Sequence, residues 1–510
     1  MDTVFVISDL HLGGCPHELI EANNHSGSQI CQSYHHLTAF IDWLPSGAKQ
    51  GGSVELVLNG DIVDFLLEDT DGENLMPRPW SANEDEVIAK LEKIVERTHD
   101  SNGRGPFEAL RDFLANGHAL TLILGNHDVE LSLPCVRRHL EKLLGIDRGQ
   151  AQFRFIYDGE AYVRGDLLIE HGNRYDRFNI IDHSALRQER SSMSRKMPLE
   201  KEGRKTGRFT PPAGSVLVTE VFNPLKRKFR FLDLLKPETG AVLPLLLALH
   251  PNLSAVLNAI VTFGKISPRL ATSGFDGPAI PSQDGQLAAL SSRPHATLAD
   301  ILKQELGSDA GLFKVLGGEI GQLSAGSTWE TIQKLSANIG KWLTEQNNLF
   351  VAIGSDGQRR KQLLVALRKL KNDSTFNPAY EKLEYLDAAK AMAKSGGFST
   401  VIFGHTHLPK KIDNLVYEDR SFRYINTGTW ADVIQIPTAL FDDGPDGRVA
   451  LEAFVNAMSD SKFSGYVGRY LSYAEVVLEN DRVQDAELYS YAGSDNPRTP
   501  LTLLSIPLCV

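Results

Sequence analysis

Five short segments rich in Asp, Asn and His punctuate this sequence, and four of them directly follow an apolar run typical of a buried β-strand. These runs are residues 4–7, 56–58, 120–124 and 401–403, and the remaining segment follows residues 166–169. Open α/β folds bind their ligands where parallel strands end. The sequence therefore predicts an α/β fold that gathers five polar segments at one site: Ser8-Asp9-Leu10-His11, Asn59-Gly60-Asp61-Ile62-Val63-Asp64, Gly125-Asn126-His127-Asp128, Glu170-His171-Gly172 and Gly404-His405-Thr406-His407.

The side chains in these segments offer oxygen and imidazole donors and no thiolate. This donor set suits Mn, Fe, Zn or Co at an open site better than a closed structural zinc site. In an extended backbone, side chains two residues apart point the same way, so Asp9 with His11, and His405 with His407, are expected to reach one ion together. Each segment alone is more often a loop with a hydrogen-bonded histidine. All five in this order favour a metal centre over that structural role.

In order and spacing the segments resemble the motifs of the calcineurin-like metallophosphoesterases, DxH, GDxxD, GNH(D/E), H and GHxH. The resemblance covers roughly residues 1–185 and 390–435. It implies a two-sheet β-sandwich flanked by helices and two divalent metal ions, with Mn²⁺ expected first and Fe, Zn, Co or Ni as alternatives. By this resemblance one ion would be held by Asp9, His11, Asp61 and His407, and the other by Asp61, Asn126, His171 and His405, with Asp61 bridging them.

The resemblance also implies a reaction, the hydrolysis of a phosphoester or phosphodiester by a hydroxide that bridges the two ions. His127 would face the substrate and protonate the leaving oxygen or stabilise charge there. Asp64, three residues after Asp61, would fix the tautomer of His127 by a hydrogen bond. His127 and Asp64 are therefore the predicted catalytic residues.

Three alternatives remain open. The related UDP-2,3-diacylglucosamine pyrophosphatases share the opening seen at residues 8–13 and carry a helical cap that grips acyl chains. They typically have Arg where this chain has His127, which counts against a lipid pyrophosphatase acting at the membrane surface. A non-catalytic phosphoesterase-fold scaffold would generally have lost ligands, and no ligand is missing here. A nuclease is the third alternative, and the acidic overall charge argues against it.

The chain is much longer than the resemblance requires. Between His171 and His405 lie 233 residues (405 − 171 − 1), where the family core needs only a few tens. We therefore expect a core domain of residues 1–185 and 379–510, carrying a mainly helical cap of residues 186–378. The cap would set the choice of substrate.

The first part of the expected cap is basic. Residues 187–236 hold 13 Lys and Arg against five Asp and Glu, in a chain whose net charge is −11. A solvated arm is one interpretation, and a surface that steers a polyanionic substrate or an anionic membrane towards the site is the other. Phe222, Phe229, Phe231 and Leu232 interleave with the cations and favour a lipid or another amphiphile over bare phosphate. The residues predicted to contact substrate are Lys226 and Arg227, together with Arg174, for which a structural salt bridge is the alternative.

Composition narrows the partners and the compartment. The acidic net charge argues against a specific nucleic-acid partner, so a phosphorylated small molecule or a lipid-linked substrate is expected. The start of the chain has no basic region ahead of its first apolar run, and the four cysteines lack metal-type spacing. These features predict a cytoplasmic protein, with peripheral contact at the inner membrane face as the alternative. Residues 241–263 are apolar but interrupted at Pro244 and Pro251, which favours a buried helical hairpin over an interfacial pair.

Periodicity predicts further elements. Residues 37–44, 84–98, 106–116 and 380–393 are expected to be helices, and their alternation with strands predicts a sheet rich in parallel pairs. Residues 152–157 and 160–163 are expected to form a hairpin. The expected antiparallel strands near the end are residues 449–454, 473–479 and 486–491.

Overall fold

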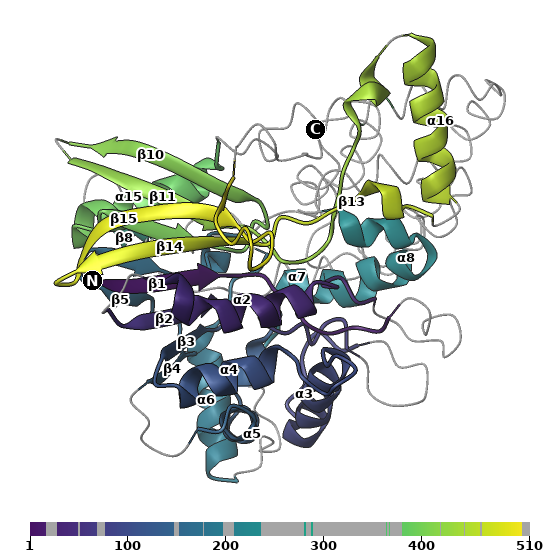
Figure 1. The fold of residues 1–510 in the computed structure, drawn as a ribbon. Helices are drawn as coiled ribbons and strands as arrows, with labels where there is room; N and C mark the ends of the chain where they lie inside the picture. Colours follow the sequence, from purple (N-terminus) through teal and green to yellow (C-terminus); the bar gives the residue numbers. More distant parts are fainter. Residues whose placement is uncertain are drawn as a thin grey trace.

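Two β-sheets lie face to face at the centre of the computed structural model (Figure 1). The structure describes residues 1–16, 28–48, 52–68, 77–146, 152–176, 178–196, 209–235, 380–418, 420–442, 444–459 and 462–501, together with 280–281, 287–288, 364 and 367. The first sheet has the strand order β16 (Thr499–Pro500), β15 (Arg482–Ser490), β14 (Ser472–Glu479), β1 (Asp2–Ile7), β2 (Val54–Asn59), β3 (Ala119–Ile123) and β4 (Phe153–Ile156). The second has the order β10 (Pro409–Tyr417), β11 (Arg420–Thr427), β9 (Thr400–Phe403), β6 (Leu167–Ile169) and β5 (Tyr162–Arg164).

Parallel pairs form the middle of both sheets. In the first sheet β1, β2, β3 and β4 run parallel, and β14 joins β1 antiparallel. In the second, β9 runs parallel to both β6 and β11. The carboxyl ends of β1, β2 and β3 therefore meet at one edge of the first sheet, and those of β6 and β9 meet at one edge of the second.

The apolar core explains why the central strands contain almost no polar residue. Val4 and Val6 of β1 belong to the cluster between the sheets, whereas Phe5 and Ile7 belong to the cluster beneath the helices. Successive strand residues point to opposite faces, so a strand covered on both faces must be apolar throughout. The same reasoning applies to β9, where Ile402 faces the first sheet and Val401 faces a helix on the other side.

Helices cover the outer face of each sheet. The first sheet is covered by α2 (Tyr34–Gly47), α3 (Glu84–Arg97), α4 (Pro106–Ala115), α5 (Pro134–Leu143) and α6 (His183–Ser194). The second is covered by α15 (Leu383–Gly396), which packs against Val401 and Phe403. This helix–sheet–sheet–helix arrangement confirms the predicted α/β sandwich, and the four helices expected from periodicity are all present.

Two expectations near the sheets were wrong. Residues 152–163 do not form a hairpin, because β4 pairs with β3 in the first sheet while β5 pairs with β6 in the second. Residues 449–454 are not a strand but part of the helix α16 (Pro445–Ser459). Leu451, Phe454 and Met458 are buried at helical spacing, which a six-residue window cannot distinguish from a buried strand.

The expected cap is described only in part. Helix α6 runs through residue 185, so the expected boundary between core and cap falls inside a helix whose Leu186 is buried in the main core. Within residues 209–235 the chain forms α7 (Ala213–Leu217), a π-helical turn at Val218–Phe222, α8 (Asn223–Lys228) and a 3-10 turn at Arg230–Leu234. Most of the expected cap, including residues 241–263, lies outside the described residues.

Candidate metal centre

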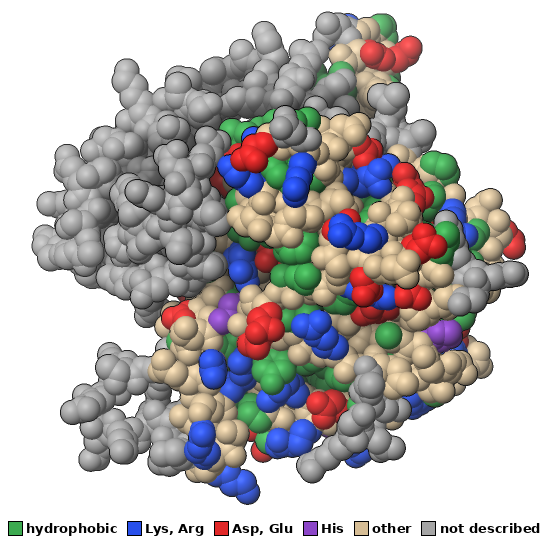
Figure 2. Space-filling model, turned by 90° about the vertical axis from the view of Figure 1, so that its left-hand side faces the viewer, with side chains coloured by type: hydrophobic (Ala, Val, Ile, Leu, Met, Phe, Trp, Pro, Cys, Tyr) green, Lys and Arg blue, Asp and Glu red, His purple; other side chains and the backbone are tan. Residues whose placement is uncertain are grey.

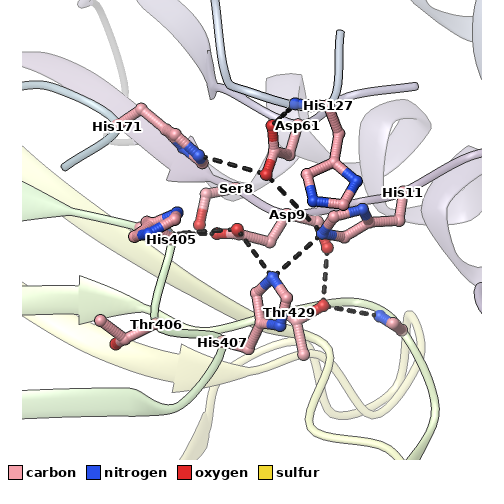
Figure 3. A network of polar contacts seen from close by, with 12 residues as sticks. Ser8, Asp9, His11, Asp61, His127, His171, His405, Thr406, His407 and Thr429 are labelled. Atoms are coloured by element: carbon pink, nitrogen blue, oxygen red, sulfur yellow. Dashed lines mark hydrogen bonds and ion pairs between the residues drawn. The ribbon is translucent and has the colours of Figure 1, made fainter. Parts of the chain in front are cut away.

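All five polar segments meet where β1, β2, β3, β6 and β9 end (Figure 3). Backbone hydrogen bonds join the segments: the Asp9 amide donates to the Gly60 carbonyl at 3.1 Å, and the Gly404 amide donates to the His171 carbonyl at 2.9 Å. The first connects two strand ends within the first sheet, and the second connects two within the second sheet. The loops are therefore fixed relative to one another before any ligand binds.

The donor atoms form two groups that share Asp61. One atom from each of Asp9, His11, Asp61 and His407 lies within 4.8 Å of the others, and the same holds for Asp61, His171 and His405. These groups contain every carboxylate and imidazole predicted for the two ions. Asn126 lies in the same region, because the amide of the next residue, His127, donates to Asp61 Oδ1 at 2.8 Å. The structure thus brings together all seven residues predicted as ligands.

The ligand backbones are not extended, contrary to the expectation that Asp9/His11 and His405/His407 would point the same way from extended chain. Asp9, His11, Asp61, His405 and His407 have φ values of 52°, 45°, 51°, 67° and 62°. For residues other than Gly, this left-handed conformation costs about 1–3 kcal/mol each, and it persists where surrounding contacts enforce it. Asp9 and His11 still fall in one donor group, but His405 and His407 fall in different groups, so the expectation that the second pair would reach one ion together is wrong. The first and last segments meet instead, with His11 Nε2 3.0 Å from His407 Nε2.

Two glycines leave room for carboxylates. A Cβ atom on Gly125 would lie 2.1 Å from Asp61 Oδ1, and one on Gly404 would lie 2.7 Å from Asp9 Oδ2. Any side chain at either position would displace a predicted ligand. The Gly in the Gly-Asn-His and Gly-His-Thr-His segments is therefore required for close approach of the backbone to the site.

The arrangement fits a divalent cation. Asp61 Oδ2, Asn126 Oδ1 and His171 Nε2 are buried and have no hydrogen-bond partner, although His171 Nε2 lies 3.2 Å from Asp61 Oδ2. Hydrogen bonds orient two rings from behind, since His171 Nδ1 lies 2.8 Å from the Asn59 carbonyl and His11 Nδ1 lies 2.9 Å from Asp64. This leaves Nε2 of each ring for a metal. Buried acceptor atoms that face one another require a cation or a proton between them.

The pKa values of His171 and Asp61 in the ion-free protein also indicate that these buried carboxylates need positive charge beside them. Burial would lower the pKa of His171, but Asp61 and Asp9 outweigh burial and raise that pKa to about 10. Burial would raise the pKa of Asp61, but His171 and His127 hold it well below its usual value. A proton on His171 therefore balances buried carboxylate charge when no metal is bound.

Several residues that support the ligands were not singled out from the sequence. Asp128 accepts hydrogen bonds from the amides of Gly125 and Ile62, both at 2.7 Å, and so joins the second and third segments. Thr429 donates through Oγ1 to the Asp9 carbonyl at 2.7 Å. Asp176 lies 3.2 Å from His405 Nε2. Asp128 belongs to the Gly125-Asn126-His127-Asp128 segment, so the sequence pattern could have identified it. Thr429 and Asp176 lie outside the five segments, and only the fold places them beside the ligands.

The predicted catalytic residues also lie together. Asp64 Oδ2 is 2.9 Å from His127 Nδ1, as the tautomer hypothesis requires, and it is also 2.9 Å from His11 Nδ1. The link to His11 was not predicted. One buried carboxylate thus holds a predicted ligand and the predicted acid.

The predicted substrate contacts are less well placed. Arg174 donates to the Gly159 carbonyl and lies 3.5 Å from Glu170, which is the structural salt bridge weighed as its alternative. The Lys226 ammonium is buried 3.5 Å from Asp233. The backbone of Arg227 lies in α8, and its side chain is outside the described part. Substrate binding by these three residues stays a prediction.

Most of the apolar residues expected to interleave with the cations are buried. Phe229, Phe231 and Leu232 are at most 4% exposed, and Phe222 is partly buried. Within the same basic segment, Arg190 is also buried and donates to the Tyr157 carbonyl at 3.1 Å. These residues therefore stabilise the fold, and the sequence argument for an amphiphile loses its main support.

The sandwich and the Asp, Asn and His cluster at its strand ends define a metal-dependent phosphoesterase. Residues 3–207 match the family described as calcineurin-like phosphoesterase, and this part of the chain belongs to that superfamily, whose domain is that of a metal-dependent phosphoric ester hydrolase. A comparison with curated proteins gives no match. The family match ends before the Gly404–His407 segment, so it is the fold that brings His405 and His407 to the other ligands.

Proposed function

We propose that the protein hydrolyses a phosphoester or phosphodiester at a dinuclear metal centre bridged by Asp61. The observation that carries this proposal is the pair of donor groups that share one Asp61 carboxylate, each completed by two or three further Asp or His donors. A single structural ion would need only one such group. Two adjacent groups around one bridging carboxylate are typical of hydrolytic two-metal sites.

When bound, two divalent ions would neutralise phosphoryl oxygens and lower the pKa of a water molecule, which then attacks phosphorus. Asp9, His11, Asp61 and His407 would hold one ion, and Asp61, Asn126, His171 and His405 the other. Asn126 contributes a neutral oxygen, which limits the negative charge that an incoming phosphate meets. Mn²⁺ is the ion we expect first, because the donors are oxygen and imidazole without thiolate.

His127 is the residue placed to deliver a proton. Its Nδ1 lies 2.9 Å from Asp64, and its side chain is 16% exposed, whereas those of His11 and His171 are 1% exposed. With Nδ1 donating to Asp64, Nε2 is the nitrogen that would face the leaving oxygen of a bound substrate. Asp64 keeps this orientation and stabilises the imidazolium form, so His127 acts as general acid when the leaving oxygen departs.

The structure gives a separate reason against each of the three alternatives, the lipid pyrophosphatase, the non-catalytic scaffold and the nuclease. A lipid pyrophosphatase is less favoured, because Phe229, Phe231 and Leu232 are buried rather than presented to lipid. A non-catalytic scaffold is disfavoured by the full donor set with His127 in place. A nuclease would need a basic surface, and over the described part of one face Lys, Arg and acidic side chains are interspersed (Figure 2). A phosphorylated small molecule or lipid-linked substrate remains our proposal.

The compartment is also a proposal. Cys15, Cys31 and Cys135 are free thiols, which is usual in a reducing cytoplasm. Among the helices that the structure describes, none combines the length and the apolarity needed to cross a bilayer. Peripheral contact with the inner membrane face stays an untested alternative.

The proposed function is tested with the purified full-length chain. After removal of bound metal with chelator, addition of Mn²⁺ should restore hydrolysis of p-nitrophenyl phosphate or bis-p-nitrophenyl phosphate, and Asp61→Asn should abolish it. Metal content is measured in the same samples. Two bound ions without any turnover of either ester would support the scaffold alternative instead.

A further inference from the structure

A short loop after the His171 ligand connects two of the residues proposed for the second ion. Asp176 Oδ2 lies 3.2 Å from Nε2 of His405 and accepts a hydrogen bond from Asn179 Nδ2 at 2.8 Å. Its other oxygen accepts from the Phe178 amide at 3.0 Å. Because Nε2 of His405 is engaged with Asp176, Nδ1 is the nitrogen left for a metal. Asp176 therefore fixes both the tautomer and the direction of this ring.

Asn179 extends this contact to the amide ligand. Asn126 Nδ2 donates to Asn179 Oδ1 at 3.3 Å, while Asn126 Oδ1 is buried without a hydrogen-bond partner. An amide side chain has a donor end and an acceptor end, and either can be turned towards a site. The bond to Asn179 engages the donor end of Asn126 and leaves the oxygen for a cation. One residue thus decides which end of Asn126 faces the metal.

Hydrogen bonds join the loop of residues 173–179 both to itself and to helix α7. Asn173 Nδ2 donates to the Asn179 carbonyl at 2.8 Å, and the Asn179 amide donates to the Asp176 carbonyl at 2.9 Å. On the other side, the amide of Gly214 in α7 donates to the Phe178 carbonyl at 2.7 Å. Helix α7 belongs to the segment inserted between the family's fourth and fifth motifs.

Gly214 also lies directly against the Asn179 side chain. A Cβ atom on Gly214 would be 2.0 Å from Asn179 Oδ1, the atom that accepts from Asn126. No real Cβ contact is that short, so a larger residue at position 214 must displace either α7 or the Asn179 amide. The inserted segment therefore packs on the one atom that orients Asn126.

We propose that Asp176 and Asn179 are positioning residues for the second metal ion, and that packing of α7 through Gly214 keeps Asn179 in place. Occupancy of the second ion thereby depends on the docking of the inserted segment. This inference rests on the proposed dinuclear function, because it concerns the ion held by Asp61, Asn126, His171 and His405. The ion held by Asp9, His11, Asp61 and His407 does not use this loop and should be unaffected.

The first test measures metal binding rather than activity. Metal-free full-length protein is titrated with Mn²⁺ by calorimetry, and bound metal is counted by mass spectrometry after dialysis against limiting Mn²⁺. We expect two ions for the natural chain. Asn179→Ala and Asp176→Asn should each weaken the second binding step about 10- to 100-fold and leave the first unchanged. The electron paramagnetic resonance spectrum should change from that of a coupled Mn²⁺ pair to that of an isolated ion.

Gly214→Ala tests whether the packing of α7 against Asn179 matters for the second ion, independently of changes in Asp176 and Asn179 themselves. Ala is a better helix former than Gly, so the substitution should not weaken α7 by propensity. We expect it to weaken the second ion in the natural background and to have no further effect in the Asn179→Ala background, where the colliding oxygen is absent. Ala213→Gly is the matched control, since it perturbs the neighbouring position of the same helix without adding an atom beside Asn179, and it should leave both binding steps unchanged.

The outcomes distinguish this inference from the proposed function. One ion in the natural chain would overturn the dinuclear proposal and the inference with it. Two ions in the natural chain, with both steps unchanged in Asn179→Ala and Asp176→Asn, would overturn only the inference. An equal loss in Gly214→Ala and Ala213→Gly would refute the specific contact with Asn179. If Gly214→Ala does not fold, the two loop variants still decide whether the residues position the second ion.

Discussion

Asp64 and His127 are joined by a hydrogen bond of 2.9 Å between Oδ2 and Nδ1, and the same oxygen lies 2.9 Å from Nδ1 of His11. Burial would raise the pKa of Asp64, but His127 and His11 outweigh it and hold that pKa far below its usual range. Asp64 is therefore ionised at neutral pH. The Asp64 carboxylate thus holds both His11, a proposed ligand of the first ion, and His127, the proposed acid.

We predict that Asp64→Asn impairs metal binding and catalysis together. The carboxamide is neutral, so its oxygen is a weaker acceptor for the two rings than the carboxylate oxygen, and its NH₂ group cannot accept the hydrogen bond that Asp64 Oδ1 takes from the Leu66 amide. We expect a loss of about 10- to 100-fold in kcat/KM and a weaker first ion, because support of a ligand has effects of this size. Calorimetric Mn²⁺ titration and steady-state kinetics measure the two. Unchanged Mn²⁺ affinity would show that His11 does not need Asp64.

His127→Asn should separate catalysis from metal binding. His127 lies in neither of the two donor groups that share Asp61, so both ions should bind as before. We expect kcat to fall about 10²- to 10⁴-fold with an ester that has a poor leaving group. The loss should be much smaller with p-nitrophenyl esters, because that leaving group departs without protonation. An equal loss with both kinds of ester would contradict the role of general acid.

The sequence was sufficient for most of the fold because both faces of the central strands are buried. Strands such as β1 and β9 read as unbroken apolar runs, and the loops that follow them carry the ligands. It was not sufficient for residues 152–163, where the chain leaves β4 in one sheet and enters β5 in the other. Both a hairpin and such a crossing produce two short strands around a turn, and only tertiary pairing distinguishes them.

For the site, as for the fold, the sequence predicted some features and not others. Motif spacing singled out Asp9, His171 and the other candidate ligands that the structure brings together, because metal binding requires those residue types. It did not identify Asp176 or Asn179, because their role depends on a loop that folds back towards residues 229 and 53 positions away in the chain, respectively. The left-handed backbone of the ligand loops was also missed, since apolar patterning carries no information on φ at the residues that follow a strand.

We predict that Mn²⁺ affinity rises with pH through the neutral range. In the ion-free protein Asp61 and Asp9 overcome the effect of burial and raise the pKa of His171 to about 10, so the ring is protonated at neutral pH. The second ion must displace this proton, and each unit of pH below about 10 therefore costs up to about tenfold in affinity. Calorimetry in buffers of different ionisation enthalpy should detect the released proton. The natural chain and His127→Asn should behave alike, and a pH-independent affinity would contradict the prediction.

The last prediction concerns Glu130, a carboxyl that is only 4% exposed and accepts a hydrogen bond from the Ser81 amide at 3.2 Å. Burial raises the pKa of Glu130 to about 7 from an ordinary 4.5, although Lys90 opposes this. Between these two values the folded protein keeps a proton that the unfolded chain has lost, so Glu130 lowers stability as pH rises from 4.5 to 7, and the loss persists above 7.

Glu130→Gln removes this titration and keeps an oxygen for Ser81. At pH 8 the variant should be more stable than the natural chain by about 1–3 kcal/mol, and near pH 4.5 the two should be alike. Thermal midpoints at both pH values measure this, with the exposed Glu418→Gln as the control in which the difference should be small at either pH. Because the buried Lys90 ammonium also lies 3.9 Å from Glu86, it keeps a partner in the variant. A lower midpoint for Glu130→Gln at pH 8 would mean instead that Glu130 is ionised and stabilises Lys90.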